Sequence, residues 1–347
     1  MIPSSAETPE GLSSIVPGNG SRVPTDDGVV TGMGWWRGAV AVSGFVLGLS
    51  CCLTLAVVEW AAWVLVLPGR RPGAVGAQLA FAADPEAPER RLGEPIEAVA
   101  ADGVRLAGIW HPARGDRGPG RGRVVLLIHG FAEDPSALLA RMEALNRHGW
   151  DVAALDARAH GRSGGDRGSF GGREAADVAA WLDALAGSGR VGPGAVPVAV
   201  WGRSMGAAIA ARAAADDPRV TALVLEAAYL DLGETLAAVM RRKRVPLPRL
   251  AARLVAARAR ALAGVSLTSP RPIDLAPRIA APALVVHGTD DSLIPLADAR
   301  RLARSFPRPA TFVEVPGAGH NSVVEVGGAA LLQRIATFLD DAVAARG

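Results

Sequence analysis

The chain has 347 residues, half of them hydrophobic and 20% of them charged, which is enough apolar material for a large core and excludes a mainly disordered protein. Its net charge of +3 is small for this length and no nucleic-acid-binding motif occurs, so no nucleic-acid partner is expected. The two cysteines, Cys51 and Cys52, are neighbours in an apolar run, so they cannot join distant parts of the fold, and they leave the redox compartment open.

The first part of the chain combines a polar tail with a long uncharged run. Residues 1–34 are rich in Gly, Ser, Pro and Asp and show no apolar period, which predicts a flexible tail. The run from Gly38 to Val58, as a helix, has about the length of the roughly 30 Å hydrocarbon core of a bilayer. Tryptophans lie at both ends of this run, as at membrane interfaces: Trp35, Trp36, Trp60 and Trp63. We therefore predict a single-pass transmembrane anchor over residues 35–68, in contact with membrane lipid.

Two other interpretations of the apolar run stay open, a buried core helix and a cleaved signal peptide. The run has no polar face and lies outside the domain that follows, which argues against a core helix. A signal peptide begins with a short basic segment, whereas here a long tail precedes the run. Arg37 precedes the run, while Arg70 and Arg71 follow it, and this excess favours a cytoplasmic position for the rest of the chain.

After a linker at residues 69–93, short apolar runs alternate with amphipathic stretches. This alternation predicts an α/β domain over residues 94–345 with a mostly parallel eight-stranded sheet and flanking helices. The expected strands cover residues 95–100, 104–110, 123–128, 151–155, 196–201, 220–226, 282–287 and 310–315. The expected helices cover residues 135–147, 173–187, 205–215, 296–305 and 328–344. Segment 229–275 interrupts the alternation with a helical composition, and we interpret it as an inserted cap.

A candidate nucleophile lies in the segment VAVWGRSMGAAIA, which contains the motif G-x-S-x-G. An apolar strand precedes Ser204 and an Ala-rich helix follows it, so the serine lies at a sharp turn between strand and helix. Such a turn strains the backbone at the serine, and Gly202 and Gly206 relieve the crowding around it. The motif therefore predicts that Ser204 is exposed at the carboxyl end of the sheet as a nucleophile.

A serine hydroxyl needs a base to accept its proton, and the base needs a carboxylate to fix its tautomer. His320 lies in a loop of small residues after the last expected strand, and Asp291 follows the strand before it. Unrelated families of serine hydrolases carry their triad residues in different orders along the chain. The order nucleophile, acid, base that Ser204, Asp291 and His320 show is found in one of these families. Asp290 competes with Asp291 for the role of the acid, and Asp231 is a weaker alternative.

The oxyanion of a tetrahedral intermediate needs hydrogen-bond donors. The backbone N–H of Met205, at the start of the helix after the nucleophile, is one expected donor. The backbone N–H of Phe131, in the loop after the expected strand 123–128, is the other. We also expect the Phe131 ring to form a wall of the acyl pocket.

Several motifs occur together in one order: His129-Gly130-Phe131, D-A-R-A-H-G-R-S, the G-R-S-M-G turn, H-G-T-D-D-S-L-I-P and G-A-G-H. Together they resemble the α/β-hydrolase superfamily, most of all its BEM46-like and serine-aminopeptidase-like members, over about residues 94–345. The resemblance implies the α/β-hydrolase fold with a helical cap. In the family the acid stands three residues after the glycine of the second H-G motif, which selects Asp291 over Asp290. The D-A-R-A-H-G-R-S loop is structural in the family.

These motifs predict a serine hydrolase that cleaves carboxylic esters, lipid esters among them, through an acyl-serine intermediate. The partner is then a small-molecule acyl substrate, and no metal or organic cofactor is implied. An acyltransferase, a peptidase and a cofactor-free haloperoxidase use the same triad and stay as alternatives. A non-catalytic membrane scaffold is the alternative from another class, and a complete triad argues against it. The oligomeric state is left open.

A basic stretch lies in the predicted cap. Residues 241–260 contain eight basic side chains and no acid: Arg241, Arg242, Lys243, Arg244, Arg249, Arg253, Arg258 and Arg260. A solvated helix, a contact with anionic lipid headgroups and a site for an acidic substrate are the three interpretations.

Overall fold

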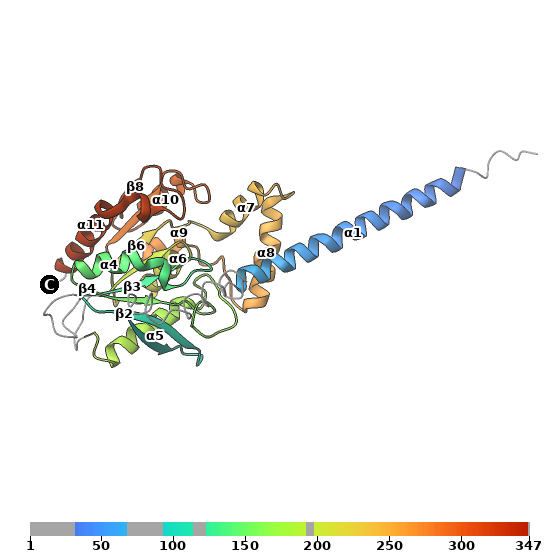
Figure 1. The fold of residues 1–347 in the computed structure, drawn as a ribbon. Coiled ribbons are helices and arrows are strands. Elements are labelled where there is room, and N and C mark those ends of the chain that lie inside the picture. The colour runs from blue at the N-terminus through green and yellow to red at the C-terminus, as the bar shows by residue number, and fades with distance from the viewer. Residues whose placement is uncertain (1–31, 68–92, 114–122, 192–197, 346–347) are drawn as a thin grey trace, which may run out of the picture. The chain divides into compact units, whose positions relative to one another are not determined.

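The computed structural model describes residues 32–67, 93–113, 123–191 and 198–345. Of the predicted tail at residues 1–34 and the predicted linker at residues 69–93, residues 1–31 and 69–92 lie outside these ranges. The chain divides into two compact units, one that ends at Thr54 and one from Leu55 to Gly347. The second unit contains the sheet and the helices that pack on it (Figure 1).

A single eight-stranded sheet organises the second unit, in the order β1-β2-β4-β3-β5-β6-β7-β8. β1 (Glu94–Val99) and β2 (Arg105–His111) form an antiparallel hairpin, and β2 is also antiparallel to β4. All other pairs are parallel. The parallel strands are β3 (Arg123–Ile128), β4 (Trp150–Leu155), β5 (Val198–Arg203), β6 (Val220–Glu226), β7 (Ala283–Gly288) and β8 (Thr311–Val315). The predicted mostly parallel sheet of eight strands is confirmed.

Helices cover both faces of the sheet, which explains why its central strands are apolar at every position. Successive side chains of a strand point to opposite faces. Val124 and Leu126 of β3 therefore join the core cluster of α5, α6 and α10, while Val125 and Leu127 join the cluster of α4 and α11. The bounds are η2 (Pro135–Leu138), α4 (Leu139–Arg147), α5 (Glu174–Gly187), α6 (Met205–Asp216), α10 (Leu296–Arg304) and α11 (Val323–Ala344).

The last helix begins earlier than its sequence predicts. The expected start is residue 328, but α11 begins at Val323, and Val323 and Val324 are buried in the core. Gly328 interrupts the helix with φ 57° and ψ −153°, a conformation that glycine adopts without a Cβ clash. α11 therefore consists of two helical segments that meet at Gly328, and the second of them is the helix that the sequence predicts.

A helical hairpin lies between β6 and β7. It consists of α7 (Leu232–Arg242) and α8 (Pro248–Ala263), and is followed by the short helices α9 (Pro272–Leu275) and η3 (Ala276–Arg278). Asp231 caps α7, because its carboxylate accepts hydrogen bonds from two backbone N–H groups of the first turn. Val255, Ala259 and Leu262 on one side of α8 are buried, so this side attaches the hairpin to the domain.

One long apolar helix precedes the sheet. α1 extends from Gly32 to Val66, and within it the segment Val40–Val66 is long and apolar enough to cross a membrane. This length and composition agree with the expected anchor.

The last turns of α1 belong to the second unit and pack into it. Ala62 and Val66 are fully buried, in one cluster with the inner side of α8. Glu59 accepts two hydrogen bonds from the Arg258 guanidinium of α8, the second of 2.8 Å, and one of 2.7 Å from Trp63 Nε1. The backbone N–H of Gly168 donates to the carbonyl of Val66 over 2.9 Å. The end of α1 is therefore a structural part of the domain, and Figure 1 shows it beside α8.

We expect Val66→Ala to destabilise the full-length protein in detergent and Val57→Ala to leave its stability unchanged. Val66 is fully buried, whereas Val57 is 59% exposed in the same helix. Loss of two buried methyl groups costs about 2 kcal/mol, including the cavity that remains. The measurement is the temperature of half-inactivation of ester hydrolysis for both variants. Equal temperatures would show that the end of α1 does not pack on the domain.

Candidate active site

The backbone of the turn at Ser204 is strained, and it passes so close to neighbouring carbonyl groups that glycine is needed on both sides of the serine. Ser204 joins β5 to α6 with φ 51° and ψ −111°, a strained conformation for a residue with a side chain. A Cβ atom on Gly202 would lie 2.0 Å from the carbonyl oxygen of Gly206. A Cβ on Gly206 would lie 2.2 Å from the carbonyl oxygen of Ile128. Both glycines are therefore required by close backbone contacts around the serine.

The structure brings three of the predicted site residues together in one hydrogen-bonded chain. Ser204 Oγ lies 3.0 Å from His320 Nε2, and His320 Nδ1 lies 2.8 Å from Asp291 Oδ2. They follow the ends of β5, β8 and β7, which meet at one edge of the sheet because these strands are parallel. In this arrangement Nδ1 carries a proton for the carboxylate, and Nε2 is left to accept the serine proton.

The environment of Asp291 keeps its carboxylate ionised. Oδ1 accepts hydrogen bonds from the backbone N–H groups of Leu293 (2.8 Å) and Ile294 (2.9 Å). Burial of the carboxylate opposes its charge, but the hydrogen bond from His320 and these backbone bonds outweigh burial and lower the pKa of Asp291. His287 is also buried beside it, with Nε2 3.5 Å from Oδ2, and burial lowers the pKa of this second imidazole.

The two competing acids lie elsewhere. Asp290 is exposed, and its Oδ1 accepts a hydrogen bond of 2.9 Å from Thr289 Oγ1. Asp231 caps α7 on the hairpin, as described above. The contact with His320 Nδ1 is made by Asp291. The geometry thus agrees with the choice of Asp291 over its neighbour.

The loop after β3, which contains Phe131, lies next to the serine turn because Ile128 and Gly202 are paired across β3 and β5. His129 is fully buried at the base of this loop, and its Nε2 accepts the backbone N–H of Ala157 (3.1 Å). Its Nδ1 therefore donates to the Gly130 carbonyl (2.7 Å), and burial lowers the pKa of His129 to about 4, so the ring is neutral. This neutral imidazole fixes the backbone of the loop.

The Phe131 ring takes part in an aromatic group. It stacks on Phe170 at a centroid distance of 5.1 Å and meets His160 edge-on at 6.2 Å. Met205 begins α6, so its N–H is among those that have no acceptor within the helix. The two expected donors thus come from the adjoining ends of β3 and β5.

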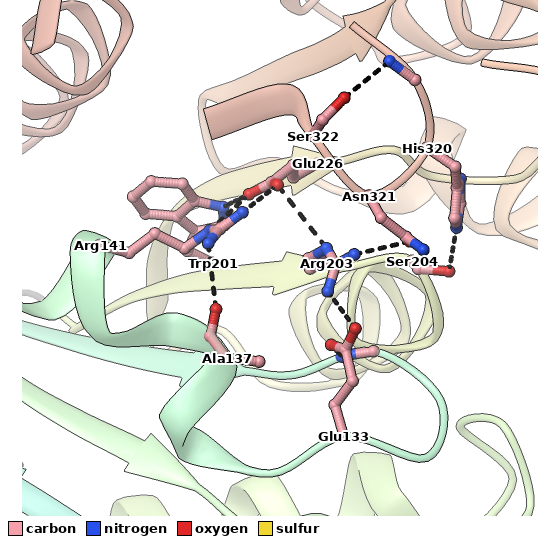
Figure 2. Close-up of polar contacts among 12 residues, drawn as sticks. Glu133, Ala137, Arg141, Trp201, Arg203, Ser204, Glu226, His320, Asn321 and Ser322 are labelled. Carbon is pink, nitrogen blue, oxygen red and sulfur yellow. Dashed lines mark hydrogen bonds and ion pairs between the residues drawn. The ribbon is translucent and has the colours of Figure 1, made fainter. Parts of the chain in front are cut away.

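Arg203, which directly precedes the serine, connects three loops (Figure 2). Its guanidinium donates to the carboxylate of Glu133, which in turn accepts the backbone N–H of Gly130 over 2.8 Å. It also donates to Asn321 Oδ1 over 2.7 Å, and Asn321 is the residue after His320. One side chain therefore binds the Phe131 loop and the His320 loop, while its own backbone precedes Ser204.

A buried ion pair continues this network (Figure 2). Arg141 of α4 donates to both carboxylate oxygens of Glu226, one bond being 2.8 Å, and Trp201 Nε1 donates to the same carboxylate over 3.1 Å. Arg203 Nε lies 3.9 Å from Glu226. The positive charges of the two arginines are balanced by the negative charges of Glu226 and Glu133. Removal of one member would leave a buried charge unpaired, at a cost of about 3–5 kcal/mol.

Comparison with known proteins gives the family. A family model described as serine aminopeptidase, S33 matches residues 120–266, and one described as TAP-like protein matches residues 257–346. An uncharacterized protein of Mycobacterium tuberculosis is 30% identical over 72% of this chain and 80% of its own length. The chain belongs to the α/β-hydrolase superfamily. A monoacylglycerol lipase of Mycolicibacterium smegmatis is also 30% identical to this hydrolase, over 63% of this chain and 86% of that protein.

Solved structures share the fold of the hydrolase. An esterase of Pyrococcus furiosus superposes with a TM-score of 0.57 at 22% identity, over 72% of this chain and 91% of its own. A membrane phospholipase A superposes with a TM-score of 0.53 at 22% identity, over 86% of this chain and 99% of its own. The residues before Glu94 make up more than a quarter of this chain, so the second match includes part of that segment.

Sequence reasoning missed the polar network of the hydrolase. Arg203 and Glu226 are charged residues at the ends of apolar strands, and this is the signal that marks them in the sequence. Their partners could not be named, because Glu133 and Asn321 lie 70 and 118 positions away from Arg203 in the chain. No group of three or more His, Cys, Asp or Glu side chains that could hold a metal ion occurs in the part of the hydrolase that the structure describes.

Proposed function

We propose that this hydrolase is a membrane-anchored serine esterase that cleaves carboxylic esters, with lipid esters as its natural substrates. The observation that carries the proposal is the hydrogen-bonded chain from Ser204 Oγ through His320 to a buried, ionised Asp291. In such a chain the imidazole takes the hydroxyl proton as the serine oxygen attacks, which activates the serine at neutral pH.

In the proposed reaction Ser204 Oγ attacks the ester carbonyl carbon while His320 Nε2 takes the hydroxyl proton. The carbonyl oxygen becomes an oxyanion, which accepts hydrogen bonds from the backbone N–H groups of Phe131 and Met205. The C–O bond to the alcohol then breaks, and His320 returns the proton to the leaving oxygen. Water repeats the sequence on the acyl-serine and releases the acid. Asp291 stabilises the imidazolium in both halves.

The membrane part of the proposal rests on the apolar segment of α1. Residues 38–58 are uncharged, and side chains beyond them pack on the domain, so the free part of the helix has about the length of a bilayer core. The fold match to a membrane phospholipase A that includes part of the segment before Glu94 supports the same conclusion. Arg70 and Arg71 after the span, against Arg37 before it, support a cytoplasmic position of the catalytic domain.

A serine peptidase is the second candidate function, because one matching family model is that of a serine aminopeptidase. An amide requires His320 to protonate a far more basic leaving amine, whereas an alcohol leaves more easily. The relatives named as lipase and phospholipase favour the ester.

We expect the full-length protein in detergent to react with a fluorophosphonate and to hydrolyse p-nitrophenyl esters and monoacylglycerols. We expect no more than trace release from aminoacyl p-nitroanilides. The measurement compares kcat/KM across an ester series from acetyl to palmitoyl, the monoacylglycerols and the anilides. A higher kcat/KM for the anilides would replace the esterase with the peptidase, and reaction with none of these substrates would overturn both.

A further inference from the structure

The α8 helix is apolar on two sides, only one of which is covered. Its outer side presents side chains spaced three or four positions apart, which is one face of a helix. This outer stripe consists of Leu250, Leu254, Ala257 and Ala261, all exposed. Leu250 is 50% exposed and Leu254 is 44% exposed, in a helix whose opposite side is already packed. Isolated apolar residues are common on protein surfaces, but a row of them along one helix face indicates a surface that binds a partner.

The turn between α7 and α8 adds a third exposed leucine. Leu247 is 71% exposed at the tip of the hairpin. Arg244 and Leu247 both have positive φ, 57° and 47°, a conformation that is unfavourable for residues with a Cβ atom. The turn therefore holds a large apolar side chain outward at the end of the outer stripe.

Basic side chains surround this apolar surface without acids to pair them. Arg241, Lys243, Arg244 and Arg253 are exposed, and none forms an ion pair with another of the described residues. Of the other basic residues of the stretch, Arg249 pairs with Glu234, Arg258 pairs with Glu59, and Arg242 donates to Ser292. Arg260 is exposed and also forms no ion pair among the described residues. The four unpaired cations closest in sequence to Leu247 and Leu250 are thus available to an anionic partner.

The position of this surface identifies the partner. Arg258 fixes α8 to Glu59, and Glu59 directly follows the uncharged run of α1. A bilayer that contains this run has its headgroup region next to Glu59, and hence next to α8. Exposed leucines with flanking cations are the composition of surfaces that enter the interface of an anionic leaflet.

We propose that Leu247, the outer stripe of α8 and the four unpaired cations together form a docking surface for the anionic headgroups and upper acyl chains of the bilayer. The proposal rests on the proposed membrane anchor, but not on ester hydrolysis. It adds a second contact beside the span. Arg242, at the end of α7, donates a hydrogen bond to Ser292, so the hairpin contacts the loop that contains Asp291.

The test places the full-length protein in nanodiscs of phosphatidylcholine, with or without phosphatidylglycerol. An environment-sensitive fluorophore is attached at Leu250→Cys, with Cys51 and Cys52 replaced by serine. The matched control is the same label at Val326→Cys, because Val326 is also 50% exposed but belongs to α11. We expect a blue shift of emission at position 250 in anionic discs that decreases with salt, since such attraction is screened over about 10 Å at 0.1 M. We expect no shift at position 326.

Two variants that lose the same number of charges distinguish docking through this surface from a general attraction between a positive protein and an anionic membrane. Each basic side chain at an anionic surface strengthens binding about fivefold. Replacement of Arg241, Lys243, Arg244 and Arg253 by Gln should therefore abolish the difference between anionic and neutral discs at position 250. The control replaces four exposed arginines of α10, α11 and a nearby loop, with the same change of net charge: Arg301, Arg304, Arg308 and Arg334. This control should keep the difference, and both variants should hydrolyse p-nitrophenyl acetate at the original rate.

Three results would overturn the proposal. One is a label at position 250 that stays as water-exposed as the label at position 326 in both kinds of disc. Another is an equal loss of the shift in both charge variants. The third is a shift at position 250 that requires an added acidic protein and not the lipid. Co-elution of the protein with the discs reports the anchor, and hydrolysis of p-nitrophenyl acetate reports the esterase, so failure of either is seen separately.

Discussion

Ser204→Ala is expected to lower kcat for p-nitrophenyl ester hydrolysis by about 10⁶-fold and to abolish labelling by a fluorophosphonate. The reacting oxygen is removed, and the activity that remains is what the oxyanion donors provide to water. The fold should persist, because within the described residues Ser204 Oγ bonds to His320 alone, and alanine takes the same backbone without added volume. Labelling is measured by gel fluorescence and folding by thermal unfolding.

Ser305→Ala is the matched control for this variant. Ser305 ends α10, its hydroxyl donates to the Leu302 carbonyl over 2.6 Å, and it forms no hydrogen bond with a triad residue in the described part of the chain. Its activity and labelling should equal those of the original protein. Complete labelling of the Ser204 variant would assign the nucleophile to another residue.

Asp291→Asn is expected to lower kcat by about 10⁴-fold, and Asp290→Asn by less than about threefold. The amide oxygen at position 291 can still accept the N–H groups of Leu293 and Ile294. Its NH₂ group then faces His320 Nδ1 and donates to it, which moves the imidazole proton to Nε2. In that tautomer Nε2 cannot accept the serine proton.

Both variants replace an aspartate by asparagine, so a difference in their activities reports which of the two positions provides the carboxylate that contacts His320. The measurement is kcat for a p-nitrophenyl ester together with the rate constant of fluorophosphonate labelling. Thermal unfolding checks that the loop after β7 is intact. If Asp290→Asn were the more damaging variant, the acid of the triad would be Asp290, and the contact of 2.8 Å between Asp291 and His320 would not describe the active state.

The sheet could be predicted from the sequence because its signals are local. β3 is expected and observed at residues 123–128, and β6 at residues 220–226, since both are apolar runs that are buried on both faces. The relation of Gly202, Ser204 and Gly206 is local as well, because a strand, a turn and a helix fix it within a few residues. Asp291 could be distinguished from Asp290 only by resemblance to a family.

Other features have no local signal. Ala62 and Val66 are buried against α8, but a helix that is apolar on all sides gives no indication of where lipid ends and protein begins. The short helical segment that precedes Gly328 was not expected, because only the segment after Gly328 was predicted as a helix. The contacts of Arg203 depend on the order of strands in the sheet, which brings distant loops together.

The shared guanidinium of Arg203 has a consequence for how this enzyme can diversify. The serine turn, the loop of Glu133 and the loop of Asn321 all depend on one side chain, so changes in any of these loops are constrained by the other two. The α7–α8 hairpin contributes no residue to that network. The three loops that carry the proposed chemistry are therefore inherited together as a unit, whereas substitutions in the hairpin leave the contacts of Arg203 unchanged.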